Sequence, residues 1–284
     1  MVPSGDGVAG VCNEEDLVRS PLVDVARELR RTTRIAGMVV VTSAMLSAYL
    51  IRQRFVAPRE RDQVRARWVG IWASTLLDIF GVRVLARGPV LSADRGHLVV
   101  SNHRSAADIL LLLRAFGGPI VSRADLARWP LIGRAAKAAG TVFVERTDAV
   151  SGASAVRTIR ALLREKATVI LFPEGTTYPG DDVRPFFAGA FVAAMHTPID
   201  IVPVGIAYAS GSGAAFVNET FGAHLSRMAA APPSTVAMCV GTPILVGDNA
   251  RSASLRDETH AAVQELVRAA RVLVDGSIDE LTTP

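Results

Sequence analysis

The stretch SNHRSAADIL, residues 101–110, places His103 and Asp108 five residues apart, directly after an apolar run. On one continuous helix the two side chains would lie about 140° apart, so they meet only if His103 stands in a loop and Asp108 in the first turn of the following helix. An aspartate is favoured there as a helix cap, which is one explanation of the pair. The other explanation is chemical: the carboxylate accepts from one imidazole nitrogen, and the second nitrogen acts as a general base.

Other polar side chains follow apolar runs elsewhere in the chain. Arg123 follows PIVS, Arg146 follows TVFVE, and Glu174, Gly175 and Thr176 follow TVILFP. In open α/β sheets, binding and catalytic residues gather at the carboxyl ends of the strands. If these runs are neighbouring strands, the polar residues and His103 come together at one edge of the sheet.

Several kinds of catalytic site are excluded by what the sequence lacks. It contains no G-x-S-x-G motif, no H-E-x-x-H motif and no cluster of metal ligands, so we expect no metal site. Neither of its two lysines follows a glycine, which excludes a phosphate-binding P-loop. Its two cysteines, Cys12 and Cys239, form no C-x-x-C motif. We therefore expect the base to act on a hydroxyl of a bound substrate, without a covalent enzyme intermediate.

The segment after residue 82 alternates between short apolar runs and amphipathic patterns, which indicates an α/β domain with a largely parallel or mixed sheet flanked by helices. Continuous runs of valine, isoleucine and leucine are typical of strands buried on both faces. Strands are expected at 81–88, 97–102, 119–123, 141–146, 168–174, 201–209 and 235–241, and helices at 108–117, 154–166 and 254–274. Ser154 is the expected N-cap of the second of these helices.

The N-terminal part has a different composition. Residues 27–67 carry ten arginines against three acidic residues, and the stretch 35–51 between two arginine clusters carries no charge. A second apolar stretch, 68–82, contains two tryptophans and a single charged residue, Asp78. Together they predict a helical hairpin that enters one leaflet of a membrane, or a marginal span followed by an interfacial helix. Two core helices of a soluble protein are the alternative.

The charge of this segment indicates its partner. Arginines beside apolar helices attract anionic lipid, whereas the poor interleaving with aromatic residues argues against nucleic acid. We therefore expect a membrane surface as a partner, and no nucleic acid. The expected organisation is a disordered polar lead over 1–26, a membrane-associating helical segment over 27–82 and an α/β domain over 83–284.

Four blocks, in order, resemble the signature of glycerolipid acyltransferases, the lysophosphatidic-acid acyltransferase family. NHRSAAD at 102–108 resembles the N-H-x-x-x-x-D motif of that family, and GTVFVERT at 140–147 resembles its arginine-bearing block. LFPEGTT at 171–177 resembles its F-P-E-G-T block, and IDIVPVGIAY at 199–208 its late proline-containing block. A lone H-x-x-x-x-D motif is weak evidence for this family, but four blocks in the same order are specific evidence. The resemblance covers roughly residues 68–245.

The resemblance implies transfer of a fatty acyl group from an acyl thioester, of coenzyme A or acyl carrier protein, to the hydroxyl of a lysolipid. No cofactor is implied beyond this donor substrate. His103 would take the proton of the hydroxyl, and Asp108 would orient and stabilise the imidazolium. Glu174, Gly175 and Thr176 would bind the polar head of the acceptor.

The acceptor implied first is 1-acylglycerol-3-phosphate, which would give phosphatidic acid in phospholipid biosynthesis. Arg146 would hold its phosphate bidentately, and Arg123 would bind a phosphate of the acceptor or the donor. The sequence departs from this subgroup at Thr177 and Phe187, where arginine and lysine are common. Another lysolipid, such as lyso-ornithine lipid or a lysophospholipid, is therefore an alternative acceptor.

The alternative from another class of enzyme is a thioesterase or lipase. The expected location is the cell membrane, with the catalytic domain facing the cytoplasm.

Overall fold

A six-stranded mixed sheet forms the centre of the computed structural model, which describes residues 21–92, 94–145 and 147–282. The strand order is β1-β7-β6-β2-β5, with β8 beside β6. All neighbours pair in parallel except that β6 runs antiparallel to β7 and β8. The strands are β1 Val82–Arg87, β2 Gly96–Ser101, β5 Thr168–Leu171, β6 Ile199–Tyr208, β7 Ser234–Val240 and β8 Ile244–Leu245. A parallel pair, β3 Val121–Arg123 and β4 Val142–Val144, adjoins β5 through a bridge between Ile120 and Ile170. The predicted sheet is confirmed.

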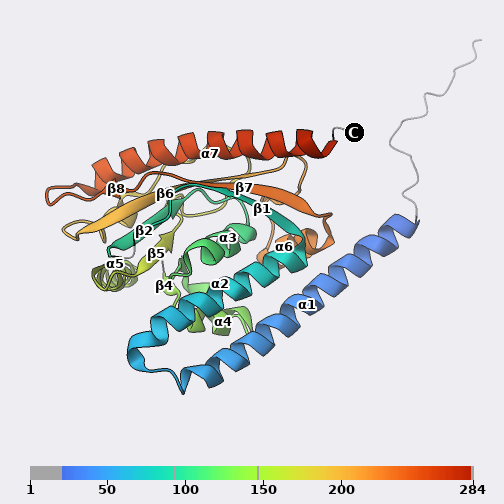
Figure 1. The fold of residues 1–284 in the computed structure, drawn as a ribbon, viewed down its shortest axis with the longest axis horizontal. Helices are drawn as coiled ribbons and strands as arrows, with labels where there is room; N and C mark the ends of the chain where they lie inside the picture. Colours follow the sequence, from blue (N-terminus) through green and yellow to red (C-terminus); the bar gives the residue numbers. More distant parts are fainter. Residues whose placement is uncertain (1–20, 93, 146, 283–284) are drawn as a thin grey trace, which may run out of the picture.

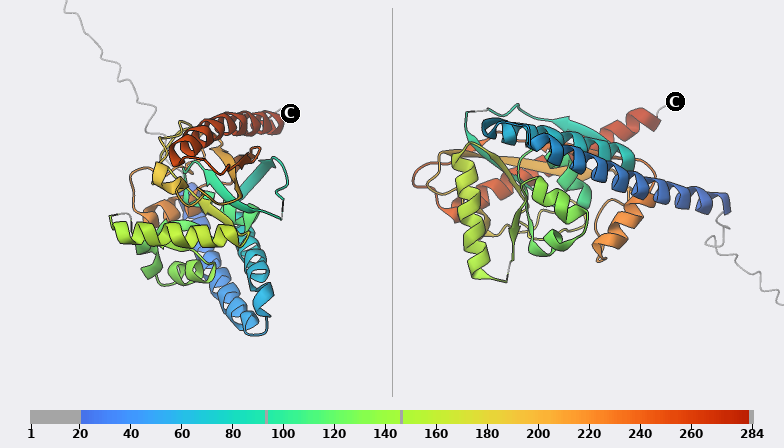
Figure 2. Two further views of the ribbon diagram at one scale, coloured as in Figure 1. Left: turned by 90° about the vertical axis from the view of Figure 1, so that its left-hand side faces the viewer. Right: turned by 90° about the horizontal axis from the view of Figure 1, so that it is seen from below.

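Helices cover both faces of this sheet (Figure 1). Helix α7 packs along one face against β6 and β7, and α2 and α3 lie on the other face. Helix α5 packs on β4, β2 and β5 and stands at the edge of the molecule (Figure 2). The α-helices are α1 Pro21–Gln53, α2 Arg61–Phe80, α3 Ala106–Phe116, α4 Ile132–Ala138, α5 Ala149–Arg164, α6 Phe221–Ala230 and α7 Ser252–Thr282. Within the described residues, short 3-10 helices lie at Pro58–Glu60, Ala124–Arg128 and Ala188–Phe191.

The strands β2 and β6 are the most completely buried part of the sheet. Every residue of β2 and β6 is buried, as expected for strands covered on both faces. Gly205 of β6 allows α7 to approach closely, because a Cβ there would stand 2.2 Å from the carbonyl carbon of Leu266. The sheet therefore gives β2, which ends at Ser101, a rigid position between two layers of helices.

Helix α5 begins earlier than predicted. Its N-cap is Asp148, whose carboxylate accepts from the backbone N–H groups of Val150 and Ser151 at 3.0 and 3.1 Å. The prediction of Ser154 as N-cap is therefore wrong, because a stronger acceptor stands two turns upstream. The short elements α4, α6 and β8 were not predicted at all.

The predicted N-terminal helical hairpin is present as α1 and α2, which pack against each other. Residues 1–20 of the predicted polar lead lie outside the described residues. The remaining part of that lead, 21–26, differs from the prediction, because Pro21 begins α1 and the leucine and valines that follow continue the helix. Val69, Ala73, Leu76, Leu77 and Phe80 of α2 are buried. Helix α2 therefore packs one face into the core of the domain.

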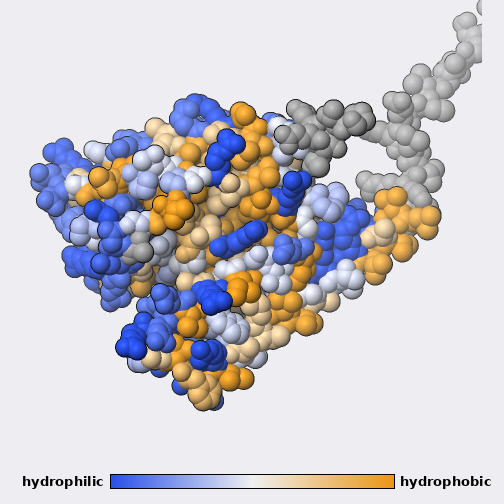
Figure 3. Space-filling model, in the orientation of Figure 1, coloured by the Kyte–Doolittle hydropathy of each residue, from blue (hydrophilic) through white to orange (hydrophobic). Residues whose placement is uncertain are grey.

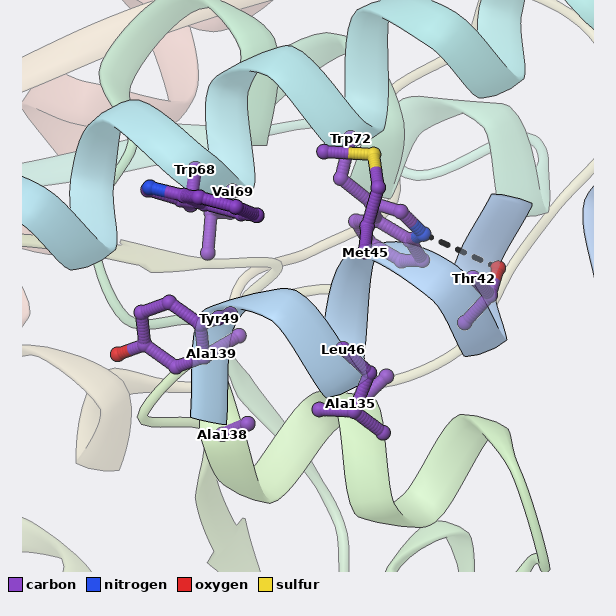
Figure 4. Close-up of a pocket in the computed structure, with 10 residues that line it drawn as sticks. All are labelled: Thr42, Met45, Leu46, Tyr49, Trp68, Val69, Trp72, Ala135, Ala138 and Ala139. Atoms are coloured by element: carbon purple, nitrogen blue, oxygen red, sulfur yellow. Dashed lines mark hydrogen bonds between the residues drawn. The ribbon is translucent and has the colours of Figure 1, made fainter. Parts of the chain in front are cut away.

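Helix α1 forms the outer layer of the hairpin. Residues Leu22–Gln53 are long and apolar enough to cross a membrane, and only 11% of the most apolar window is buried. Figure 4 shows the contact between the two helices, where the Trp72 indole donates to the Thr42 hydroxyl at 3.1 Å. Ala135, Ala138 and Ala139 of the α4 segment close the same small apolar pocket.

Candidate active site

The end of β2 sets the position of the catalytic candidates. Asn102 follows this strand and fixes it to β6: its side-chain amide accepts from the Ile206 N–H at 2.8 Å and donates to the Ile206 carbonyl at 2.9 Å. The chain then turns, and α3 begins at Ala106 with Ser105 as N-cap. His103 therefore stands in the loop and Asp108 in the first turn of the helix, as the sequence predicts.

The structure brings His103 and Asp108 together. The imidazole Nδ1 lies 2.9 Å from Asp108 Oδ2. The same oxygen accepts from the backbone N–H groups of Arg104 and Ser105, at 2.5 and 2.8 Å. Asp108 is thus the N3 residue of a capping box with the N-cap Ser105, and it also contacts the imidazole. A general-base role of His103 stays a prediction. With Nδ1 engaged, Nε2 is left to face the groove that His103 lines.

A side chain of the neighbouring strand β6 also binds the Asp108 carboxylate. The Tyr208 hydroxyl, at the end of β6, donates to Asp108 Oδ1 at 2.6 Å. Burial, together with the nearby Asp108 charge, raises the pKa of Tyr208 well above its ordinary value, so the phenol stays protonated and keeps donating. Phe172 stacks on the His103 ring with centroids 4.0 Å apart. These contacts fix the imidazole in one orientation.

Replacing Tyr208 by phenylalanine tests this contact. We expect kcat to fall about tenfold, because a hydrogen bond to a charged group contributes about 1.5 kcal/mol or more. The fold is retained because Asp108 keeps its contacts with His103, Arg104 and Ser105. Steady-state kinetics measure the effect, and an unchanged kcat would show that the phenol only fills space.

Glu174 is held by donors from the protein. Its Oε1 accepts from the His103 N–H at 2.8 Å and from Arg104 Nη1 at 3.0 Å, and its Oε2 accepts from the Arg184 N–H at 3.1 Å. The side chains of Arg104 and Glu174 are 3% and 0% exposed. The buried carboxylate therefore fixes the backbone at His103. Binding of an acceptor head by Glu174 stays a prediction.

Arg104 connects the catalytic loop to the segment after the F-P-E-G-T block. Besides Glu174, its guanidinium donates to the carbonyls of Gly180 and Asp182, at 2.5 and 2.8 Å. Sequence reasoning missed Arg104 and Tyr208. The available signals were their places inside two of the family blocks, since Arg104 lies between His103 and Asp108 and Tyr208 ends the late block.

Three of the remaining predicted residues lie along a groove of about 680 Å³ that His103 also lines. Arg123, Gly175 and Thr176 line it. The Arg123 side chain is 67% exposed and forms a bidentate pair with Asp125, with both contacts at 3.1 Å. Arg146 lies outside the described residues.

An apolar cavity adjoins this groove. The residues that line both spaces are Ala106, Ile109, Ile120, Ser122, Leu126 and Phe221. From there the cavity extends between α3 and the hairpin to Met38, Leu76 and Phe80. The site therefore combines a polar, open groove with an apolar space that reaches toward the outer helix.

Comparison with known proteins agrees with this geometry. The acyltransferase family model matches residues 83–207, which include His103, Asp108 and Glu174. A lyso-ornithine lipid O-acyltransferase of Pseudomonas aeruginosa is 30% identical over 184 residues, which are 64% of this chain and 69% of that protein. A human 1-acyl-sn-glycerol-3-phosphate acyltransferase alpha is 35% identical over 133 residues, 44% of this chain and 46% of that protein.

A solved structure has the same fold. The 1-acyl-sn-glycerophosphate acyltransferase PlsC from Thermotoga maritima superposes with a TM-score of 0.68 at 20% sequence identity. The similarity covers 86% of this chain and 98% of that one. The chain belongs to the acyltransferase family.

Proposed function

We propose that this protein transfers a fatty acyl group from an acyl thioester to the hydroxyl of a lysolipid. The observation that carries the proposal is the contact of 2.9 Å between His103 Nδ1 and Asp108 Oδ2, at the wall of a groove that adjoins an apolar cavity. A lysolipid has a polar head and an acyl chain, and the two spaces match these parts.

His103 acts as the general base. The lysolipid hydroxyl gives its proton to Nε2 as its oxygen attacks the thioester carbonyl, and Asp108 stabilises the imidazolium that forms. The tetrahedral intermediate then collapses, the C–S bond breaks, and the thiolate takes the proton from the imidazolium. The products are the new ester and a free thiol. The donor is acyl-CoA or acyl carrier protein, and the reaction requires no further cofactor.

The apolar cavity accommodates a fatty acyl chain in this proposal. Ala139 lines this cavity and also the pocket between the hairpin helices (Figure 4). Replacing Ala139 by phenylalanine fills part of the cavity. We expect kcat/KM for palmitoyl-CoA to fall about tenfold or more relative to decanoyl-CoA, because each buried methylene contributes about 0.8 kcal/mol. Ala138→Phe is the control, since Ala138 lines only the hairpin pocket; an equal change in both variants would contradict the assignment.

The hydrolase alternative fits the geometry less well. Ser101 and Ser105 are the hydroxyls nearest in sequence to His103, and both are fully buried; Ser105 Oγ caps α3 by accepting from the Ala107 N–H. Its ring partner is His224, at 3.3 Å, rather than His103. Ser105 is therefore a structural cap and not a nucleophile.

Two acceptors follow from the relatives. The first is 1-acylglycerol-3-phosphate, on which the human relative acts. The second is lyso-ornithine lipid, the acceptor of the relative from Pseudomonas aeruginosa. The groove favours the second in one respect: Arg123 is neutralised by Asp125, and Thr177 stands where an arginine would face a phosphate.

We place the enzyme at the cell membrane, with its catalytic domain on the cytoplasmic side. Large exposed apolar side chains run along α1, where Figure 3 shows an apolar edge. Replacing Val40 and Ile51 together by aspartate puts two charges on this edge. We expect about tenfold weaker binding to anionic vesicles in a flotation assay, since charged groups are costly in a bilayer. Val90→Asp is the control, an exposed valine beyond β1; equal binding by both variants would exclude this docking face.

The function is tested by acyl transfer with the purified, detergent-solubilised protein. Labelled acyl-CoA is offered with lysophosphatidate, a lysophospholipid or lyso-ornithine lipid, and the His103→Ala variant is run in parallel. A diacyl product with one acceptor, absent for the variant, supports the proposal and identifies the head group. Release of free fatty acid alone would instead support a thioesterase.

A further inference from the structure

We propose that His224 is a positioning residue of the acyl-transfer reaction, which holds the catalytic turn 102–108 in its active geometry from helix α6. The inference rests on the proposed function. His224 does not line the substrate groove and lies outside the four blocks that resemble the family signature.

The imidazole of His224 is completely buried against the start of α3. Its Nε2 lies 3.2 Å from the Ala106 backbone nitrogen, which donates to it, and 3.3 Å from Ser105 Oγ. Ala106 is the first residue of α3, whose early N–H groups have no acceptor within the helix. A histidine from a distant helix therefore satisfies an N–H group two residues before Asp108.

The backbone N–H groups of residues 103–107 all donate to a side-chain acceptor. Asp108 Oδ2 accepts from Arg104 and Ser105, and Ser105 Oγ accepts from Ala107. His224 accepts from Ala106, the N–H group that neither Asp108 nor Ser105 reaches. The three acceptors together fix the backbone that sets the distance between His103 and Asp108.

The donor at Ala106 also fixes the tautomer of His224. Because the backbone N–H can only donate, Nε2 must carry a lone pair, so Nδ1 of the neutral ring carries the proton. Nδ1 lies 3.1 Å from Glu219 Oε1, which accepts its hydrogen bond, and Arg227 Nη2 lies at the same distance from Nδ1 and pairs with Glu219. Burial lowers the pKa of His224, which favours the neutral ring that this arrangement requires.

Glu219 is itself held in place. Arg227 forms a salt bridge with it, and this contact lowers the pKa of Glu219 to about 2, so the carboxylate stays ionised. Arg227 also donates to the carbonyl of Ala215 at 2.7 Å. At the far end of α6, Arg34 of α1 donates to the Ala231 carbonyl at 2.6 Å. Helix α6 is thus fixed at both ends, and it presents the imidazole rigidly.

Three variants separate positioning from simple stabilisation. His224→Leu keeps the volume but removes the acceptor, whereas His224→Gln places an amide oxygen near the position of Nε2. Ala229→Gly lies on the same helix, away from the catalytic turn, and destabilises α6 through helix propensity and the loss of a buried methyl group. If His224→Leu does not accumulate, His224→Asn replaces it, since its amide is too short to reach Ala106.

The first measurement is kinetic. We expect His224→Leu to lower kcat about 100-fold with little change in KM for either substrate, because a displacement of about 1 Å in a catalytic group has this effect. His224→Gln recovers most of the rate. Ala229→Gly lowers the melting temperature but keeps the wild-type kcat. A kcat for His224→Leu equal to that of Ala229→Gly would overturn the proposal.

The second measurement does not depend on activity. Hydrogen exchange of the amides at 105–108, followed by mass spectrometry, reports directly on the turn. We expect faster exchange in His224→Leu and wild-type exchange in His224→Gln and Ala229→Gly. Unchanged exchange in His224→Leu would overturn the role of His224, whatever the reaction. A wild-type protein that transfers no acyl group to any acceptor would instead disprove the proposed function, and the exchange result would still decide the role of His224.

Discussion

Replacing His103 by alanine lowers the rate of acyl transfer about 1000-fold and leaves the protein folded. The expected size follows from the loss of a general base, which contributes about 100- to 10,000-fold in enzymes. His103 lines the groove and has one ring nitrogen held by a buried carboxylate. The substitution removes the group that takes the proton of the attacking hydroxyl in the proposed reaction.

The rest of the site survives this substitution. Asp108 keeps its donors at Arg104, Ser105 and Tyr208, and the backbone N–H of residue 103 still donates to Glu174. We therefore expect KM for both substrates to remain close to that of the wild type, since the imidazole acts in the transition state. The measurement is initial rate against acceptor and donor concentration. The exposed His196, replaced by asparagine, is the control; a His103→Ala variant within tenfold of the wild-type kcat would exclude His103 as the base.

The fold was largely predictable because its strands are buried on both faces. A strand such as β6, with every residue buried, appears in the sequence as a continuous apolar run, and each of the seven expected strands is present. The short elements were not predictable in this way. Helix α6 has ten residues and β8 has two, so neither carries a pattern long enough to stand out. Helix α6 nevertheless brings His224 to the catalytic turn.

The site was predictable only where its contacts are local. The pairing of His103 with Asp108 spans five residues, and helix geometry alone decides how the two side chains can meet. The partners of Glu174 depend on which distant donors the fold places around it, so its role as a buried anchor was missed. The same holds for Tyr208, which reaches Asp108 from a position 100 residues later in the chain. A motif thus identifies the reacting groups, and the fold decides which other residues hold them.

Replacing Arg104 by methionine lowers the free energy of unfolding by about 3–5 kcal/mol, because breaking a buried ion pair leaves an uncompensated charge. The remaining charge is Glu174, whose side chain is completely buried. Its contacts with the His103 and Arg184 N–H groups persist, but they do not replace the guanidinium. The carbonyls of Gly180 and Asp182 also lose their donor. Denaturant unfolding of the purified wild-type and variant proteins measures the effect. The comparison requires that the unfolding free energy of both proteins depends equally steeply on denaturant concentration.

Two further variants decide whether burial causes this loss. Arg123→Met breaks an arginine–carboxylate pair of similar geometry whose side chains are 67% and 53% exposed, and we expect it to cost less than about 1 kcal/mol. The double variant Arg104→Met with Glu174→Gln removes the uncompensated charge, so it should be more stable than Arg104→Met alone. A double variant that is no more stable, or equal losses for Arg104→Met and Arg123→Met, would show that the buried pair does not hold the catalytic loop. If the stability losses follow the expected order, the buried pair of Arg104 and Glu174 holds the backbone that positions His103.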